Sequence, residues 1–333
     1  MGTVKLKVDP DKDLFLKSDY FDNQFFTFGS FEVQGHKMDY LFHMEAFQLP
    51  GQEERLFSHF AFLDETLGEY AETTQVVDME GIRIDPDRFA IRLPDAEISG
   101  DMNKLHIFAR MDYLTLDVDV SPYRPVLPLA QDGVFPDKDL DLTGFSYPYC
   151  LTTGKLTLAN SMMLVRGDSW YVRTWQRRLP RMIFPKTIVR MLERKMTKED
   201  GTGMFLRGML CFVMSDYSVL DICFSFREGR ETSIGSLMYS NGNQVRLSIP
   251  DLAPTVIEFL KKVDDEPQTP LIFKLDFDEY DLKVRTGIIP KRQEGIFNTL
   301  PDFHFFEGLT KMHGRRGEDK LTGYAYINIM GCP

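Results

Sequence analysis

The 333-residue chain is poor in cysteine and has no apolar run long enough to span a membrane. Even residues 204–214, an apolar stretch, are interrupted by Arg207. The N-terminal segment intersperses lysine and aspartate, so it lacks the apolar centre of a secretory signal. The cysteines are too few and too scattered for a disulfide-stapled scaffold, and we expect reduced thiols at Cys150, Cys211, Cys223 and Cys332. These absences predict a cytoplasmic protein without stable membrane insertion.

Positive charge is also scarce, with 39 Lys and Arg against 50 Asp and Glu and a formal net charge of −11. Because such a field repels polynucleotides, no nucleic-acid partner is expected. One basic stretch, residues 177–195, could meet a phosphate or a membrane face, but a solvated helix face explains it as well. The chain lacks a Gly-rich phosphate loop, a nucleophile elbow around Ser and a cluster of Cys and His. We therefore expect no cofactor.

A metal site is not expected either. His304 and Glu307 have the spacing of a ligand pair on a helix, but on a strand their odd separation points them to opposite faces. Large apolar side chains, in contrast, are abundant, with 27 Phe, 17 Met and 13 Tyr. They fit a cavity for a hydrophobic small molecule, although a Phe-rich β core explains any single one equally well.

Closely spaced β-type segments dominate the chain and predict an all-β fold. Residues 25–33 and 38–48 form a hairpin pattern, and segments at 55–63, 89–93, 105–110 and 114–120 follow. Prolines between residues 121 and 149 predict a crossing loop, and a second strand series begins at residue 155. One short helix is predicted over residues 186–196, after Pro185. We place two domains at residues 1–180 and 181–333, with a boundary uncertain within 165–200.

Several segments match a known family in order and approximate spacing. They are F-F-T-F-G-S-F at 25–31, Y-L-F-H-M-E-A-F at 40–47, S-H-F-A-F-L-D at 58–64, R-G-D-S-W-Y-V-R-T-W at 166–175 and A-Y-I-N-I-M-G at 325–331. In these segments the chain resembles the carotenoid 1,2-hydratase and attachment-protein-like family, which includes fungal Diels-Alderases that form decalin rings. The resemblance implies two tandem lipocalin-like β-barrel or sandwich domains, a ligand site between or inside them, and a hydrophobic, unsaturated substrate.

Two departures from the family pattern bear on the chemistry. Val172 stands where the family's Trp-x-Asp-x-x-Trp segment has an acid, and Asn328 stands where a Glu follows the Tyr of its Gly-Tyr-x-Glu strand. Hydration of an alkene needs a proton delivered to carbon, whereas ring closure needs a folded polyene and a polarised carbonyl. Our leading hypothesis is therefore a cofactor-independent cyclase of a specialised-metabolite pathway. A hydratase, lyase or isomerase that works by proton transfer, and a non-catalytic carrier of a lipid-like ligand, stay open.

Candidate catalytic residues come from two strands. His43 and Glu45 leave the same face of a strand and can form an acid–base pair, unless that face is simply solvated. Arg173 shares a face with Tyr171 and Trp175, a geometry suited to gripping a carbonyl, although an exposed cation–aromatic ladder would look the same.

The remaining candidates are expected to contact substrate. A structural role competes in several cases, above all for His59 and for Glu307, which the resemblance implies to be a buried strand carboxylate. No feature of the sequence specifies an oligomeric state. The substrate-binding set is Phe26, His59, Tyr149, Trp170, Tyr171, Trp175, Glu307, Tyr326 and Asn328.

Overall fold

The structure is a computed structural model that divides into two compact units, Met1–Arg181 and Met182–Pro333. The predicted boundary and the predicted helix at residues 186–196 lie outside the residues that the structure describes. No helix among the described residues is long and apolar enough to cross a membrane. The described residues are 8–17, 20–48, 54–79, 83–84, 88–130, 132–136, 142–177, 205–227, 230–247, 249, 252, 255–256, 258, 272–287 and 304–332.

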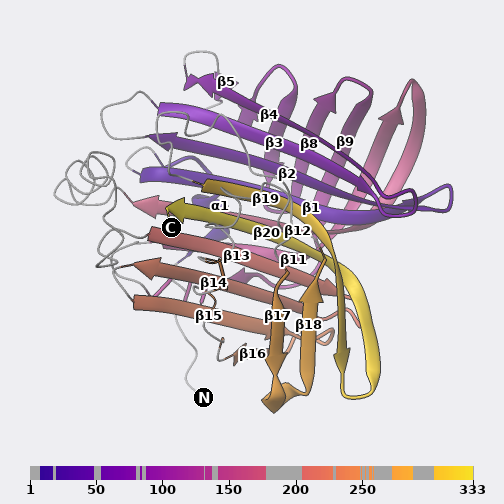
Figure 1. The fold of residues 1–333 in the computed structure, drawn as a ribbon. Coiled ribbons are helices and arrows are strands. Elements are labelled where there is room, and N and C mark those ends of the chain that lie inside the picture. The colour runs from indigo at the N-terminus through magenta and orange to yellow at the C-terminus, as the bar shows by residue number, and fades with distance from the viewer. Residues whose placement is uncertain are drawn as a thin grey trace. The chain divides into compact units, whose positions relative to one another are not determined.

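The first unit is built on one antiparallel sheet of 12 strands, preceded by the short helix α1 (Pro10–Asp13) (Figure 1). Its strand order is β4-β3-β2-β1-β12-β11-β9-β8-β7-β6-β5, with β10 paired to β11. The bounds are β1 (Tyr20–Val33), β2 (His36–Gln48), β3 (Glu54–Asp64), β4 (Glu69–Asp78), β5 (Arg83–Ile84), β6 (Phe89–Arg92), β7 (Ala96–Asp101), β8 (Lys104–Met111), β9 (Leu114–Pro122), β10 (Leu127–Pro128), β11 (Leu142–Leu158) and β12 (Ser161–Arg177).

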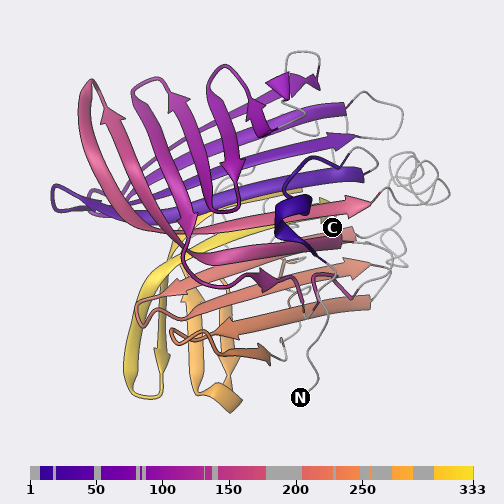
Figure 2. The same ribbon diagram turned by 180° about the vertical axis from the view of Figure 1, so that it is seen from behind.

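This sheet curls around its own apolar core (Figure 2). Every second residue of β9, from Leu114 to Val120, points inward and is buried, while the intervening residues are partly exposed. At the open side, Gln75 of β4 donates a hydrogen bond of 3.2 Å to Asp95, which precedes β7. The sheet therefore approaches closure, as expected for a barrel-like unit.

The strands β1, β2, β3 and β12 differ from β9 because both of their faces are buried. In β3, for instance, seven consecutive residues from Leu56 to Phe62 are buried. One face, with Phe25, Phe42 and Phe60, belongs to the core of the unit. We call this the inner face, and the opposite one the second face. In an ordinary antiparallel sheet the face opposite the core is exposed to solvent, whereas here it is buried along these strands.

The second unit contains one antiparallel sheet of eight strands, in the order β16-β15-β14-β13-β20-β19-β18-β17. Its core contains Leu210, Phe212, Ile222 and Ile327. The ends of this sheet meet where the Tyr280 hydroxyl donates to the Arg246 carbonyl at 3.4 Å. The bounds are β13 (Phe205–Met214), β14 (Val219–Arg227), β15 (Arg230–Met238), β16 (Gln244–Leu247), β17 (Lys274–Phe277), the 3-10 helix η2 (Asp278–Tyr280), β18 (Leu282–Thr286), β19 (His304–Arg316) and β20 (Asp319–Cys332).

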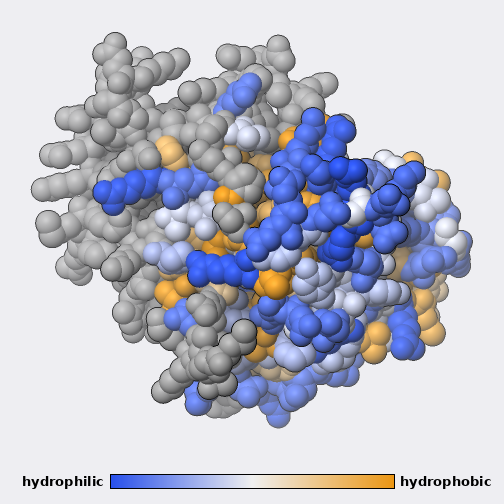
Figure 3. Space-filling view, turned by 90° about the horizontal axis from the view of Figure 1, so that it is seen from below, coloured by the Kyte–Doolittle hydropathy of each residue, from blue (hydrophilic) through white to orange (hydrophobic). Residues whose placement is uncertain are grey.

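The all-β prediction is confirmed, with one correction to its details. Residues 142–149 belong to β11 rather than to a crossing loop, and β11 and β12 complete the first sheet instead of starting a second series. Pro148 is accommodated because the register with β12 shifts between Tyr147 and Cys150. The surface over the described residues is mostly hydrophilic on the side shown in Figure 3, with apolar residues in small groups.

Candidate functional site

The second face of the first sheet brings together five of the predicted site residues. Phe26, His43 and His59 form one cross-strand row on β1, β2 and β3, because Phe26 pairs with His43 and His43 pairs with His59. Glu45 lies two residues along β2 from His43, and Trp170 of β12 faces the same side. All five are buried. Alternation along the strands therefore gathers the polar candidates on one sheet face, as predicted for His43 and Glu45.

His43 is fully buried and lies beside a carboxylate between two aromatic rings. Its Nε2 is 3.5 Å from Glu45 Oε2. The Phe26 ring lies 4.1 Å from the imidazole, centroid to centroid, and the Phe57 ring approaches it edge-on at 5.3 Å. The alternative of a solvated outer face does not hold, because Glu45 is also buried.

His59 repeats this arrangement on the next strand. It is fully buried, and its Nε2 is 3.5 Å from Oε2 of Glu72 on β4. Sequence analysis missed Glu72 because β4 is rich in Thr and Glu and lacks the apolar alternation that marks a strand. A carboxylate on the strand next to the His-Phe-Ala segment is identified only once the β3–β4 pairing is known.

The chemistry available to this face is proton transfer. An imidazole can accept or donate a proton near neutral pH, and an adjacent carboxylate orients it and stabilises its charged form. Exclusion of water strengthens these electrostatic interactions. Trp170 adds a neutral donor, since its buried Nε1 finds no acceptor among the described residues. The Phe28 ring packs against Trp170 at 5.5 Å.

Arg173 occupies the inner face instead, with Tyr171 and Trp175. Its five N–H groups donate to the backbone carbonyls of Asp13 at 3.1 Å, Phe15 at 2.9 Å, Gln24 at 3.4 Å and Thr174 at 2.5 Å, and to Asn23 Oδ1 at 2.9 Å. The guanidinium also lies 4.2 Å from the Phe25 ring centroid and 5.0 Å from that of Trp175. Burial lowers the pKa of Arg173 to about 10.

Arg173, the candidate for gripping a substrate carbonyl, therefore lies apart from His43. The arginine points to the opposite side of the sheet, and the main chain around residues 13–15 uses the donors that a substrate carbonyl would need. Tyr171 stays buried on the inner face, and burial raises its pKa above the ordinary range. Tyr149 is buried elsewhere on β11, against Tyr123 at 6.1 Å and the Arg124 guanidinium at 4.6 Å.

The second unit holds a separate polar cluster, made of Glu307, Tyr326 and Asn328. The Tyr326 hydroxyl donates to Glu307 Oε1 at 2.5 Å, and Asn328 Nδ2 donates to the same oxygen at 3.2 Å. All three side chains are buried on the side of the sheet opposite Ile327 and the apolar core. Burial, together with the charge of Glu307, raises the pKa of Tyr326.

Two further groups of this cluster were missed from the sequence. Cys211 pairs in register with both Tyr326 and Asp221, and its thiol donates to Asp221 Oδ1 at 3.7 Å. Burial raises the pKa of Asp221 to about 7. The available signal was one carboxylate within the mostly apolar residues 219–226. Among the described residues, no group of three or more His, Cys, Asp or Glu could hold a metal ion. The His304 side chain lies outside them.

Two concave sites also occur on the first unit, with volumes of about 330 and 560 Å³. None of the predicted site residues lines either of them. The larger is polar and follows the seam between β4 and the β8–β9 turn.

Comparison with known proteins finds likeness only at the level of structure. No family model and no curated protein matches the sequence. A protein from Nitrosomonas europaea provisionally named AttH superposes with a TM-score of 0.68 and 11% identity over 99% of this chain and 97% of that one. Kievitone hydratase from Nectria haematococca superposes with a TM-score of 0.67 and 14% identity, over 97% of this chain and 92% of that one. CghA, solved with Sch210972, superposes with a TM-score of 0.53 and 10% identity, over 94% of this chain and 89% of that one. At these identities the likeness shows a shared fold.

Proposed function

We propose that the protein is an enzyme that transforms a hydrophobic, unsaturated small molecule by proton transfer, as a hydratase, lyase or isomerase. The observation that carries this proposal is a pair of imidazole–carboxylate contacts, His43–Glu45 and His59–Glu72, each at 3.5 Å on one sheet face. Both histidines and Glu45 are buried, and Glu72 is partly exposed. We assign His43 as the group that exchanges a proton with substrate and Glu45 as the carboxylate that orients it.

The surroundings of His43 support an apolar substrate. Phe26, Phe57, Phe28 and Trp170 are all buried on the same face. Such rings favour an unsaturated hydrocarbon skeleton, and the polar groups among them fix its orientation. In this proposal the His43–Glu45 pair takes the place of the two family acids that the sequence lacks. The absence of those acids therefore does not argue against proton transfer.

The structural neighbours support the same broad class. One is named a hydratase, and its fold matches over 97% of this chain. We carry over no substrate from it, because 14% identity relates the folds alone. The net charge of −11 continues to favour a neutral hydrophobic partner over nucleic acid, and the unpaired thiols Cys150, Cys211 and Cys223 fit the proposed cytoplasmic location.

Ring closure is the second candidate, favoured by Trp170. With the donors of Arg173 in use, the buried Trp170 Nε1 is a neutral N–H on the aromatic face that could polarise a substrate carbonyl. In that case the side chains of the second face would act by holding a polyene in a reactive fold.

The enzyme proposal is tested with an extract of a strain in which the gene is deleted. Purified protein should consume one accumulated precursor and form one product, as followed by mass spectrometry, and the His43→Asn variant should not. Recovery of a bound molecule that stays chemically unchanged after long incubation would instead identify a carrier.

A further inference from the structure

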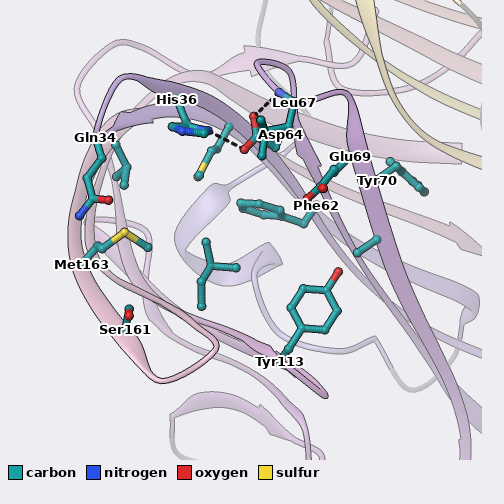
Figure 4. Close-up of a pocket in the computed structure, with 14 residues that line it drawn as sticks. Gln34, His36, Phe62, Asp64, Leu67, Glu69, Tyr70, Tyr113, Ser161 and Met163 are labelled. Atoms are coloured by element: carbon teal, nitrogen blue, oxygen red, sulfur yellow. Dashed lines mark hydrogen bonds and ion pairs between the residues drawn. The ribbon is translucent and has the colours of Figure 1, made fainter.

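The curled sheet of the first unit is hollow at the end where its strand-connecting turns gather (Figure 4). The hollow has a volume of about 330 Å³ and is formed by the β1–β2, β3–β4, β8–β9 and β11–β12 connections. We call it the turn-end hollow. Met38 and Phe62 line it, and both belong to the apolar core of the unit. Its size lies at the lower end of the range for small-molecule sites.

Large apolar side chains surround this hollow although they are open to solvent. Leu67 is 60% exposed, Tyr113 54% and Tyr70 37%, and all three line it. Exposed apolar surface costs free energy in water, and a contiguous group of such residues commonly marks an interaction site. Here the exposed group continues into an apolar interior, so the observation points to a ligand that enters the hollow.

One polar pair is built into the wall of the hollow. His36 Nδ1 contacts Asp64 Oδ2 at 2.9 Å, and Asp64 Oδ1 accepts the backbone N–H groups of Thr66 at 2.8 Å and Leu67 at 3.0 Å. Burial by itself would raise the pKa of Asp64, but the Leu67 N–H and His36 outweigh it and hold that pKa below its ordinary value. With Nδ1 engaged by an ionised carboxylate, His36 Nε2 is the ring nitrogen left to meet a ligand.

Charge narrows the class of ligand. Asp64 and Glu69 both line the hollow, so a ligand that ends in a carboxylate or phosphate is repelled. A hydroxyl group can both donate and accept a hydrogen bond, so it suits His36 Nε2 beside an apolar wall. We propose that the turn-end hollow binds a neutral, mainly apolar small molecule that carries a hydroxyl group.

This site is distinct from the candidate active site. Its residues Met38 and Asp64 pair across β2 and β3, and Met38 belongs to the apolar core, whereas His43 lies on the second face. The inference therefore does not rest on the proposed function.

The test uses the full chain and the neutral fluorescent probe N-phenyl-1-naphthylamine. The wild-type protein should bind the probe saturably, and decanol should displace it at least tenfold better than decanoate. The double variant Leu67→Ser, Tyr113→Ser should bind at least tenfold more weakly, and Ser161→Trp, which places bulk at the wall, should do the same. The matched control is Leu164→Ser, because Leu164 is 76% exposed on β12 but does not line the hollow.

Circular dichroism confirms that each variant is folded, as expected because the changed side chains are exposed. Absence of saturable binding would overturn the proposal, and so would binding that neither the double variant nor Ser161→Trp weakens. If decanoate displaced the probe as well as decanol, the assigned ligand class would be wrong.

Discussion

His43 of β2 and His59 of β3 are directly opposite each other in the antiparallel register, and each contacts its own carboxylate at 3.5 Å. A buried histidine commonly has one structural partner, so a single such pair would be unremarkable. Two pairs on neighbouring strands, among aromatic rings and away from the core of the unit, are difficult to explain by stability alone, because His43, Glu45 and His59 are buried and burial of ionisable groups is costly.

Replacement of His43 by Asn should lower turnover about 10²–10⁴-fold, the usual contribution of a general acid or base. The side chain keeps a polar group of similar size but cannot exchange a proton near neutral pH. Turnover of the precursor identified in the deletion-strain experiment measures this effect, with thermal unfolding recorded in parallel.

The chain offers a matched control in His106, a partly exposed histidine on β8 that lies 3.3 Å from Asp119 and 3.8 Å from Asp117. His106→Asn should leave turnover within about twofold of wild type. Equal losses in both variants would mean that a general effect on the fold, and not proton transfer at His43, explains the result.

Arg173→Met should destabilise the first unit by at least about 3 kcal/mol, because it leaves several buried acceptors without a charged donor. Urea unfolding measures the change, and limited proteolysis should show earlier cleavage near residues 13–15. Arg166→Met, an exposed change on the same strand, should cost less than about 0.5 kcal/mol. Full stability of Arg173→Met with abolished turnover would instead restore a substrate-binding role for Arg173.

Asp221 should make the protein less stable as pH rises from about 4 to about 7. Its pKa is raised from the ordinary 3.8 to about 7 by burial, so over this range the unfolded chain loses the proton first, and its free energy falls relative to that of the folded state. Asp221→Asn removes the effect. The unfolding free energy of Asp221→Asn, relative to that of the wild type, should therefore rise by at least about 1 kcal/mol between pH 4 and 7, since a shift of one pKa unit corresponds to about 1.4 kcal/mol.

Above about pH 8 this difference should stay constant, because Asp221 is then largely ionised in both states. Urea unfolding of the wild type and Asp221→Asn at closely spaced pH values provides the measurement. A difference that does not vary with pH would show that the carboxyl ionises normally in the folded protein.

Tyr326→Phe should lower the free energy of unfolding by about 1.5–3 kcal/mol, the usual contribution of a hydrogen bond to a charged group. Glu307→Gln should be milder than Glu307→Ala, because the amide oxygen can still accept from Tyr326 and Asn328. Thermal unfolding of the variants compares these effects. If Glu307→Ala were as stable as wild type, the cluster would have no structural role.

Local patterns predicted the fold well where the chain alternates apolar and polar residues. The hairpin of β1 and β2 and the shared face of His43 and Glu45 followed from a period of two. β4 was missed because its Thr and Glu residues give no apolar period, and β11 was shortened because Pro148 resembles a loop signal although it lies at a register shift.

The site was harder to predict because its decisive contacts join distant segments. The sequence places Tyr171, Arg173 and Trp175 correctly on one face. However, Arg173 donates a hydrogen bond to Phe15, 158 positions away, and no local sequence pattern predicts that bond. Likewise Glu72 reaches His59 only through strand pairing, and Asp221 meets Cys211 only across β13 and β14. Periodicity assigns a face, whereas the partner across that face depends on register.

Proton transfer at the second face is tested most directly by running the reaction in D₂O and analysing the product by mass spectrometry. If His43 delivers a solvent-exchanged proton to carbon, the product gains one non-exchangeable deuterium, and His43→Asn yields almost none of this product. A wild-type product that is free of carbon-bound deuterium and forms equally fast with His43→Asn would contradict the account and support ring closure by shape alone.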